Sequence, residues 1–237
     1  MNSHFLLLWL EAPLQSWGAD SKFGRRDSLD FPTKSGIAGL LLAALGASGE
    51  QRELLGEIAG LRQTVISYTR KKSESVADKG PSMLRDFHMV GSAYDDRDPW
   101  QTLMIPKKRD GLKAVGGGVK MTYRYFIQDG RFAVVVEVPA VRASTFSEAL
   151  SSPVYEVYLG RKCCAPTDLI FRGVFDDEAA AISAAAEIAK SKDLEERFRV
   201  VDGDHGDEVL TLNDVPTQFG QAKRYRERLV SIVRPYE

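Results

Sequence analysis

The stretch from Lys120 to Val138 constrains the fold of this chain more than any other. Two runs rich in β-branched and aromatic residues, KMTYRYFIQ and RFAVVVEV, stand on either side of Asp129-Gly130. An Asp-Gly pair between two such runs is a strong signal for a β-hairpin with a type I′ turn, because both positions tolerate a positive φ. We therefore expect two adjacent antiparallel strands here, as part of a sheet.

Residues 31–46, FPTKSGIAGLLLAALG, are predicted to form a turn followed by a tightly packed helix. Thr33 or Ser35 can supply the N-cap oxygen, and Gly46 suits a left-handed helix end. The free N–H groups at such a helix start, together with two hydroxyls and the ammonium group of Lys34, can hold a phosphate. The glycines of a Walker A loop are absent. The alternative is a buried helix with a solvated Lys34.

The composition, 43% hydrophobic and 27% charged over 237 residues, indicates a globular chain with a substantial core. No apolar run approaches the length of a membrane span, and the run from Leu6 to Leu10 follows no basic segment of the kind that begins a secretory signal. We therefore expect a cytoplasmic protein with no membrane partner. Cys163 and Cys164 lack the paired spacing of a zinc site and are interpreted as packed thiols.

The net charge of −1 excludes a uniformly basic nucleic-acid binder but conceals a segregation of charge along the chain. Residues 70–131 carry thirteen Lys/Arg against eight Asp/Glu, whereas residues 176–214 carry four against twelve. A local basic surface is sufficient to hold a polyanion. The acidic segment is either solvated surface or a face for a basic partner.

The order of the predicted elements indicates an α+β fold. The continuous apolar run from Phe5 to Leu10 predicts a central strand covered on both faces. A second helix at 50–61 and a strand at 64–69 follow the first helix, and a short helix capped by Ser144 or Thr145 follows the Asp129-Gly130 strands. The remaining predicted elements are a strand at 169–175, an Ala-rich helix capped by Asp176 and Asp177, and short strands at 198–201, 209–212 and 228–233. This order is that of a split β-α-β, the ferredoxin-like layout with four antiparallel strands and two helices on one face.

Two polar stretches interrupt this order. Residues 12–30 form a long connection, and a loop of that length in a compact domain is usually functional or mobile. Residues 70–82 have almost nothing to bury and are expected to form a flexible linker. The residues that follow, up to Lys120, contain the basic KKRDGLK and a hinge at Gly116-Gly117-Gly118, a composition that suits a projecting arm better than a core.

Five features, in this order and spacing, resemble a known family. They are Leu10 to Gly18 (LEAPLQSWG), Arg26, residues 31–46, Leu84 to Val90 (LRDFHMV) and Tyr158 to Pro166 (YLGRKCCAP). The chain resembles the CasD family, the subunit of type I-E CRISPR Cascade complexes that holds the 5′ handle of the CRISPR RNA (crRNA).

This resemblance implies a modified RNA-recognition fold at residues 1–175, with a thumb hairpin inserted around 70–122, and a small C-terminal appendage of a helix and short strands at 176–237. It implies a non-catalytic subunit that binds and caps the 5′ handle of the crRNA without a cofactor. The implied partners are the backbone subunits, on the first of which the thumb packs, the large subunit, and target DNA through the assembled complex.

The resemblance also carries RNA-binding roles onto particular residues. The set comprises the loop after the first strand, the arginines and the helix start that follow it, two residues of the LRDFHMV segment and the basic pair of the YLGRKCCAP segment. Arginine can stack on splayed bases and bind phosphates with two parallel hydrogen bonds, and Trp17 offers either a stacking face or a plug in the core. The candidate RNA-binding residues are Gln15, Trp17, Gly18, Arg25, Arg26, Lys34, Ser35, Gly36, Arg85, His88, Arg161 and Lys162.

A metal-independent endoribonuclease that processes CRISPR repeat RNA is the alternative, since relatives in type I-C systems cut the repeat. Such cleavage needs a base for the 2′-hydroxyl and an acid for the leaving group, and His88 is the best candidate, with Tyr68, Lys120 and Tyr123 as conceivable partners. A lone His in such a segment is more often structural or an RNA contact. We therefore expect no catalytic residue.

Two acidic clusters could suggest a metal site, but neither has the right setting. Asp95, Asp96 and Asp98 lie in the expected arm, and Asp202, Asp204 and Asp207 resemble half of a calcium loop without its distal Glu. Both clusters are interpreted as solvated turns, and no metal is expected.

Overall fold

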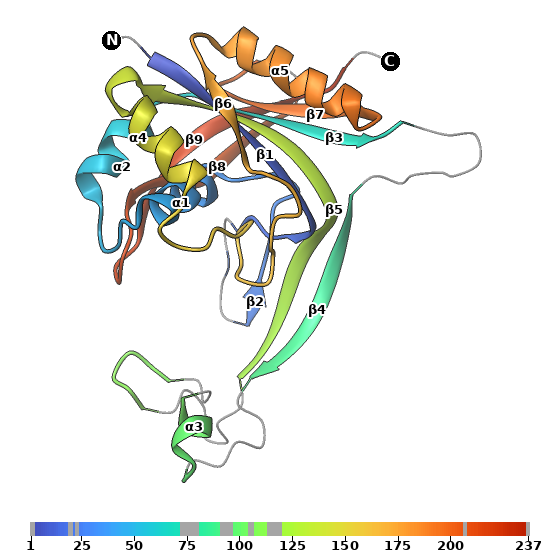
Figure 1. Ribbon diagram of the computed structural model, residues 1–237. Coiled ribbons are helices and arrows are strands. Elements are labelled where there is room, and N and C mark those ends of the chain that lie inside the picture. The colour runs from blue at the N-terminus through green and yellow to red at the C-terminus, as the bar shows by residue number, and fades with distance from the viewer. Residues whose placement is uncertain are drawn as a thin grey trace.

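A computed structural model describes residues 3–18, 21, 24–71, 81–90, 97–103, 107–112, 120–205 and 208–235. The strands are β1 (Ser3–Gln15), β2 (Arg25–Arg26), β3 (Gln63–Arg70), β4 (Ser82–Val90), β5 (Lys120–Pro139), β6 (Phe171–Phe175), β7 (Leu194–Asp202), β8 (Val209–Gln218) and β9 (Arg224–Val233). They join one sheet in the order β6-β1-β5-β3-β7-β9-β8, and β2 and β4 pair with β5 beside this path (Figure 1). The helices are α1 (Lys34–Leu45), α2 (Arg52–Ala59), α3 (Pro99–Thr102), α4 (Ala140–Ser151) and α5 (Glu178–Ser191).

The residues of the predicted hairpin form one continuous strand, β5, so the hairpin prediction is wrong. Residues 127–139 of β5 pair with β1 along one edge, while the other edge pairs with β3 at 131–136 and with β4 at 120–128. Both halves of β5 find partners in other strands, and this pairing prevails over the local turn preference. The Asp-Gly signal instead marks an irregularity within the strand, since Asp129 has a φ of 50°.

β1 lies between β5 and β6 and is covered on both faces, which confirms the prediction made from its continuous apolar run. Successive side chains of a strand point to opposite faces. Leu6, Leu8 and Leu10 accordingly belong to the larger core cluster, whereas Leu7 and Trp9 belong to a second cluster on the other face. Each face therefore needs its own cover.

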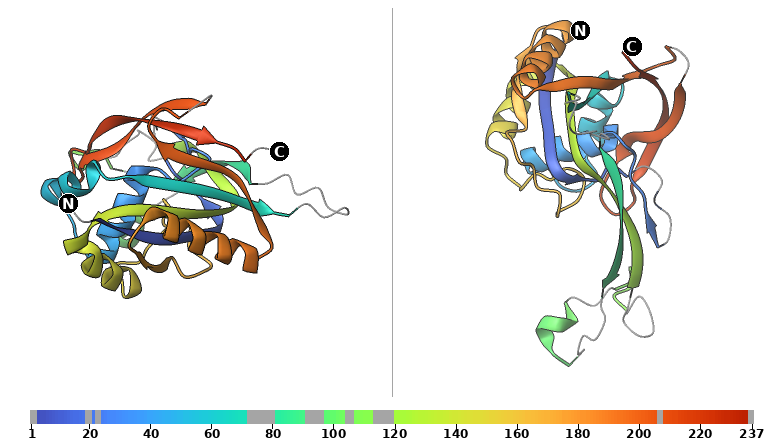
Figure 2. Two further views of the ribbon diagram at one scale, coloured as in Figure 1. Left: turned by 90° about the horizontal axis from the view of Figure 1, so that it is seen from above. Right: turned by 90° about the vertical axis from the view of Figure 1, so that its right-hand side faces the viewer.

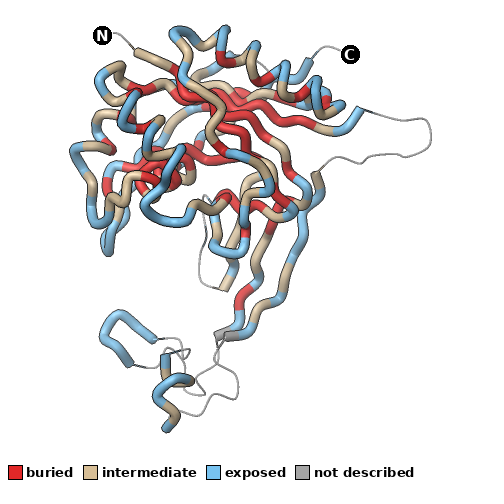
Figure 3. The backbone as a smooth tube through the Cα atoms, in the orientation of Figure 1, coloured by how far each residue is buried: buried red, intermediate tan, exposed pale blue. Residues whose placement is uncertain are grey.

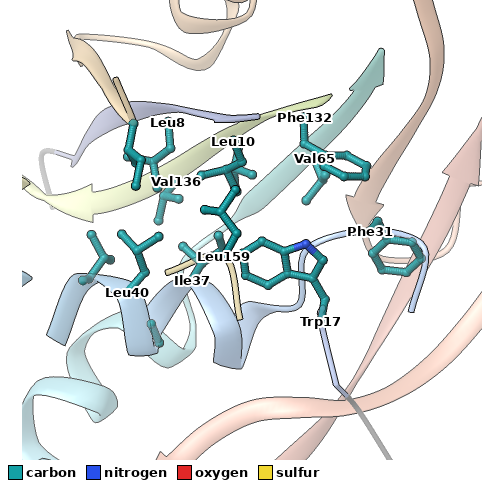
Figure 4. Packing of buried hydrophobic residues seen from close by; sticks show 14 of the residues in the cluster. Leu8, Leu10, Trp17, Phe31, Ile37, Leu40, Val65, Phe132, Val136 and Leu159 are labelled. Atoms are coloured by element: carbon teal, nitrogen blue, oxygen red, sulfur yellow. The ribbon is translucent and has the colours of Figure 1, made fainter. Parts of the chain in front are cut away.

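The larger cluster fills the space between the sheet and α1, α2 and α4, and β8 and β9 complete its wall (Figure 3). Leu8, Leu10 and Val136 of the sheet face Ile37 and Leu40 of α1 (Figure 4). This packing fixes α1 against the sheet.

α5 covers the opposite face of the sheet (Figure 2). Ala181, Ala185 and Ala189 are buried there against Leu7 and Trp9, among others, so the small side chains of the Ala-rich helix allow a close approach to the strands. The ferredoxin-like layout predicted from the sequence has helices on one face only, and α5 is an addition to it.

The helix ends test the capping predictions. Thr33 caps α1 by accepting a hydrogen bond from the N–H of Gly36, Gly46 ends α1 with a φ of 70°, and Asp177 caps α5 through the N–H of Ala180, all as predicted. The capping prediction for α4 is wrong, because this helix begins at Ala140 directly after β5 and encloses residues 144 and 145. No helix in the described ranges is long and apolar enough to cross a membrane.

β4 and residues 120–128 of β5 form a two-stranded arm that extends away from the body, with α3 beyond its end (Figures 1 and 2). The described residues do not include most of the predicted linker, Asp95, Asp96 or the Gly116-Gly117-Gly118 hinge.

Near the C-terminus the strands are longer than predicted, since β7, β8 and β9 extend beyond the expected ranges.

Candidate functional site

An open groove of ≈ 520 Å³ lies beside α1. Four parts of the chain line it: described residues around β2 (16–18, 21, 26 and 27), the side of α1 that carries Gly36 and Gly39, residues within 156–161, and residues within 219–225 at the turn before β9 and its start. These segments come from both ends and the middle of the chain, so only the folded protein forms the groove. We refer to it below as the groove.

Two glycines of α1, Gly36 and Gly39, line the groove beside Ser35, Leu40 and Ala43. A Cβ added at Gly36 would lie 2.6 Å from Cε3 of Trp17, so this glycine is needed for the indole ring to pack against the helix start. A Cβ added at Gly39 would meet nothing within 4 Å. The backbone of α1 is therefore covered by Trp17 at Gly36 and has open space beside it at Gly39.

Gly160 holds one side of the groove in place. Its φ is 94°, and a Cβ at this position would lie 1.7 Å from the carbonyl oxygen of Ser16. The N–H of Ser16 in turn donates to the carbonyl of Leu159 at 3.0 Å. This close contact fixes residues 156–161 against the end of β1.

Arg161 connects three strands or loops at the edge of the groove. Its guanidinium donates to the carbonyls of Tyr125 at 3.1 Å and Arg26 at 2.9 Å, and lies 4.6 Å from the centre of the Phe126 ring. Burial, together with the nearby Arg124 charge, lowers the pKa of Arg161. The geometry makes Arg161 a positioning residue that holds β2 against β5.

The two arginines of β2 differ in their surroundings. Arg26 lines the groove, and no hydrogen bond or ion pair of its guanidinium occurs within the described part of the chain. Arg25 is exposed, donates to Asp27 at 2.7 Å and lies 5.1 Å from the centre of the Tyr125 ring. Arg26 is thus the cation at this end of the groove that is available to a ligand.

Lys34 is not available to a phosphate, contrary to the expectation from the sequence. Its side chain is buried, and its ammonium donates to the carbonyl of Leu61 and lies 3.7 Å from Asp202. Burial lowers the pKa of Lys34. The backbone N–H of Lys34 donates to Oδ2 of Asp214 at 2.7 Å, so a carboxylate of the protein occupies the helix start.

Asp214 belongs to a buried ion network that joins the C-terminal strands to α1. Arg228 donates to its two carboxylate oxygens at 2.7 and 2.8 Å and also to Asp202. Asp202 further accepts from the N–H of Gln63 at 3.1 Å. Asp202 is therefore a structural ion-pair partner. The interpretation of this residue as part of a solvated turn is wrong.

Gln15 and Trp17 are buried and form a hydrogen bond with each other. The indole N–H of Trp17 donates to Oε1 of Gln15 at 3.0 Å, and Nε2 of Gln15 donates to the carbonyls of Leu10 and Gly130. Only 1% of Trp17 is exposed, and its ring packs in the core between α1 and the sheet (Figure 4). Trp17 is therefore a core residue, as the second of the two alternatives from the sequence predicted. The buried side chains of Gln15 and Trp17 hold the adjoining wall of the groove in place.

The other predicted site residues fall into two groups. Gly18 and Ser35 line the groove with Gly36, whereas Lys162 is exposed outside it. Arg85 and His88 do not line the groove; they lie on β4, which flanks the same part of β5 as β2 does, so one strand separates them from Arg25 and Arg26.

No catalytic arrangement forms around His88 within the described residues. Its Nδ1 lies 3.3 Å from Oδ2 of Asp86. Tyr68, on β3, is buried against Trp9 of β1. Tyr123 contacts the ring of Phe87, the residue next to His88, so Tyr123 and His88 lie on opposite faces of the arm. The side chain of Lys120 is outside the described part.

No metal-binding cluster occurs among the described residues, in which no three His, Cys, Asp or Glu side chains converge. Asp98 of the first acidic cluster caps α3 by accepting from the N–H of Trp100 at 2.9 Å. Cys164 is buried and Cys163 is exposed, so the packed-thiol interpretation holds for Cys164 alone.

The sequence reasoning missed the C-terminal contribution to the groove, from Phe219, Lys223 and Tyr225. The signal was present, because the run from Lys223 to Arg228 (KRYRER) interleaves four basic residues with a tyrosine and a single Glu. This basic run follows the acidic segment of residues 176–214 closely along the chain.

The large, mainly antiparallel sheet with helices on both faces makes this chain a mixed α+β protein. The family model for CRISPR-associated protein (Cas_Cas5) matches residues 5–231. The chain therefore belongs to the CRISPR-associated Cas5 family. A relative described as CRISPR system Cascade subunit CasD, from Escherichia coli (strain K12), is 32% identical over 174 residues, which are 71% of this chain and 70% of the relative.

Two solved structures are similar to this chain. One, described as a CRISPR RNA-guided surveillance complex, has a TM-score of 0.70 and 25% identity over 97% of this chain and 89% of the other. The second, described as a crystal structure of Cas protein, has a TM-score of 0.56 and 23% identity over 98% of this chain and 95% of the other. The second comparison supports the fold alone.

Proposed function

We propose that this chain is a non-catalytic subunit of a type I-E Cascade complex, and that it binds and caps the 5′ handle of the crRNA in the groove. Membership of such a complex is supported by the similarity of this chain to CasD and to a chain of an RNA-guided surveillance complex. Through the assembled complex it would contact the backbone subunits, the large subunit and target DNA.

The fold supports this proposal through the four strands β6-β1-β5-β3, which have the order expected of a ferredoxin-like, RNA-recognition layout. In this assignment the body of the chain ends near Phe175, and α5 with β7 to β9 is the appendage. Because α5 covers the sheet face opposite α1, we place the RNA in the groove beside α1 and not across the sheet.

The single observation that carries the proposal is the lining of the groove. The cations Arg26, Arg161 and Lys223 outnumber the carboxylates Asp27 and Glu156, and Tyr158 and Tyr225 supply aromatic rings. Single-stranded RNA is bound through cations at its phosphates and rings against its bases. A groove of this composition suits a single-stranded end better than a duplex.

The test is binding of a repeat-derived handle RNA at several salt concentrations. Arg26→Ala is expected to flatten the dependence of log affinity on log salt by about one unit, the effect of one lost phosphate contact. Lys190→Ala, on the exposed side of α5, is the matched control and is expected to leave the slope unchanged. Equal slopes for all three proteins would reject the groove as the RNA site.

We further propose that the arm docks on neighbouring subunits of the complex. The arm exposes large apolar side chains in Met83, Phe87, Met89 and Met121, and Trp100 of α3 is 78% exposed. Limited proteolysis is expected to cut the arm in the isolated chain and to spare it in the complex. Equal cleavage in both states would contradict this role.

The nuclease alternative receives no support from the arm. The structure brings none of the conceivable partners whose side chains it describes to His88, and a cleaving site needs both a base and an acid.

A further inference from the structure

The hairpin formed by β8 and β9 and the turn between them, called here the C-terminal hairpin, returns to the groove from the far end of the chain (Figure 1). Phe219, Lys223 and Tyr225 of this hairpin line the groove together with Arg26. Arg224, which stands between Lys223 and Tyr225, does not line it.

The turn of the C-terminal hairpin is fixed to the connection between α1 and α2. The N–H of Phe219 donates to the carbonyl of Glu50 at 3.0 Å, and Nε2 of Gln218 donates to the side chain of Glu50 at 3.2 Å. Gly220, with a φ of 75°, lies against the backbone of Gly49, which a Cβ at Gly220 would approach to 3.3 Å. The turn therefore sits at a defined position beside α1.

The buried ion network fixes the same hairpin a second time. Asp214 of β8 holds the first N–H of α1, and Arg228 of β9 holds Asp214. The C-terminal hairpin is thus attached to α1, the helix that lines the groove with Gly36 and Gly39. A wall held at two places loses little freedom when a ligand binds, which favours affinity.

The side chains that this wall presents have the chemistry of a single-strand binding surface. Lys223 is exposed and has no ion-pair partner within the described residues, so its ammonium is free to meet a phosphate. Tyr225 is 39% exposed and lines the groove. Aromatic rings beside a basic groove stack with bases regardless of their identity.

We propose that the C-terminal hairpin is the second RNA-binding wall of the groove, in which Lys223 contacts a backbone phosphate and Tyr225 stacks on a base of the strand that lies along α1. This inference rests on the proposed handle binding and assigns part of it to residues that the sequence motifs do not include. It makes the C-terminal appendage a part of the RNA site.

The experiment measures binding of the full chain to a repeat-derived handle RNA across a salt series. Lys223→Gln is expected to lower the salt slope by about one unit, whereas Arg224→Gln, its neighbour outside the groove, keeps the wild-type slope. Tyr225→Leu is expected to weaken binding about tenfold, and Tyr225→Phe, which keeps the ring, is expected to retain affinity. Thermal unfolding of each variant checks that all of them fold.

The outcomes separate this inference from the proposal on which it rests. If the wild-type chain does not bind the RNA, or if Arg26→Ala leaves its slope unchanged, the handle-binding proposal fails. If Arg26→Ala lowers the slope while Lys223→Gln and Tyr225→Leu behave as wild type, the groove binds RNA without the C-terminal hairpin, and this inference is overturned. Equal losses for Tyr225→Phe and Tyr225→Leu would overturn the stacking role.

Discussion

The carboxylate of Asp214 accepts a hydrogen bond at 2.7 Å from the backbone N–H of Lys34, although the two residues lie near opposite ends of the chain. A negative side chain at a helix N-terminus satisfies a free N–H group and interacts favourably with the helix dipole. Because Asp214 is itself held by Arg228, this contact joins the last two strands to the first helix.

Asp214→Ala is expected to lower the free energy of unfolding by about 3 to 5 kcal/mol, because it leaves the buried Arg228 charge without its main partner. Chemical denaturation measures this loss. Glu208→Ala is the control, since it breaks an exposed ion pair with Arg234 and is expected to cost less than about 1 kcal/mol. Similar losses in the two variants would mean that the buried network contributes no more than a surface pair.

Gly160→Ala is expected to prevent stable folding or to lower the melting temperature strongly. The new methyl group would occupy the position of the Ser16 carbonyl oxygen, and the φ of 94° is unfavourable for alanine. Gly56→Ala, inside α2 where a Cβ meets nothing within 4 Å, is expected to stabilise the protein by up to about 1 kcal/mol. Thermal unfolding compares the two, and a tolerated Gly160→Ala would refute the close contact.

Stability is expected to fall below about pH 4.5, in part through Glu11. Burial raises the pKa of Glu11, but hydrogen bonds from Lys192 and Trp9 and the charges of Lys192 and Arg131 outweigh it, and the net pKa lies below the ordinary value of 4.5. The unfolded chain then binds a proton at Glu11 more readily than the folded protein, so the contribution is present above pH 4.5 and is lost as pH falls through the folded pKa.

The measurement is the free energy of unfolding as a function of pH. Glu11→Gln is expected to show a shallower loss of stability in acid than the wild type. Glu227→Gln, on the exposed part of β9, serves as the control with the wild-type slope. A Glu11→Gln profile parallel to the wild type at every pH would rule out this contribution.

The purified chain is expected not to cleave repeat RNA specifically. A true general acid or base contributes a factor of ~100 to 10,000 in rate, so His88→Ala would abolish most activity of a nuclease centred on this residue. Cleavage of labelled repeat RNA by the wild type and by His88→Ala, with chelator present, measures the effect. Specific cutting that disappears in the variant would favour the nuclease over the binding subunit.

Local signals in the sequence predicted local structure well. The cap at Thr33, the left-handed end at Gly46 and the doubly covered β1 depend on neighbours in the chain or on the period of apolar residues, and all three are confirmed. The Asp129-Gly130 signal failed for the opposite reason. Its turn preference is local, but four other strands, β1 to β4, pair with β5 and keep it extended.

The candidate site shows the same division. The motifs located the segments that line one side of the groove, including Arg26 and Gly36. They could not show that Lys34 points into the protein, because its partners Asp202 and Asp214 come from strands near the C-terminus. Nor could they place Lys223 and Tyr225 beside α1, since that position depends on the pairing of β8 with β9 and on Glu50.

The position of β1 in the sheet has a consequence for synthesis of the chain. Its apolar residues are synthesised well before the strands that pair with it, because β5 and β6 are complete only when residues 127–139 and 171–175 have been added. Until then an unusually apolar strand has two open edges, the condition in which nascent chains aggregate. Premature termination before β5 is therefore expected to yield insoluble fragments, whereas chains that extend through β6 can pair both edges of β1.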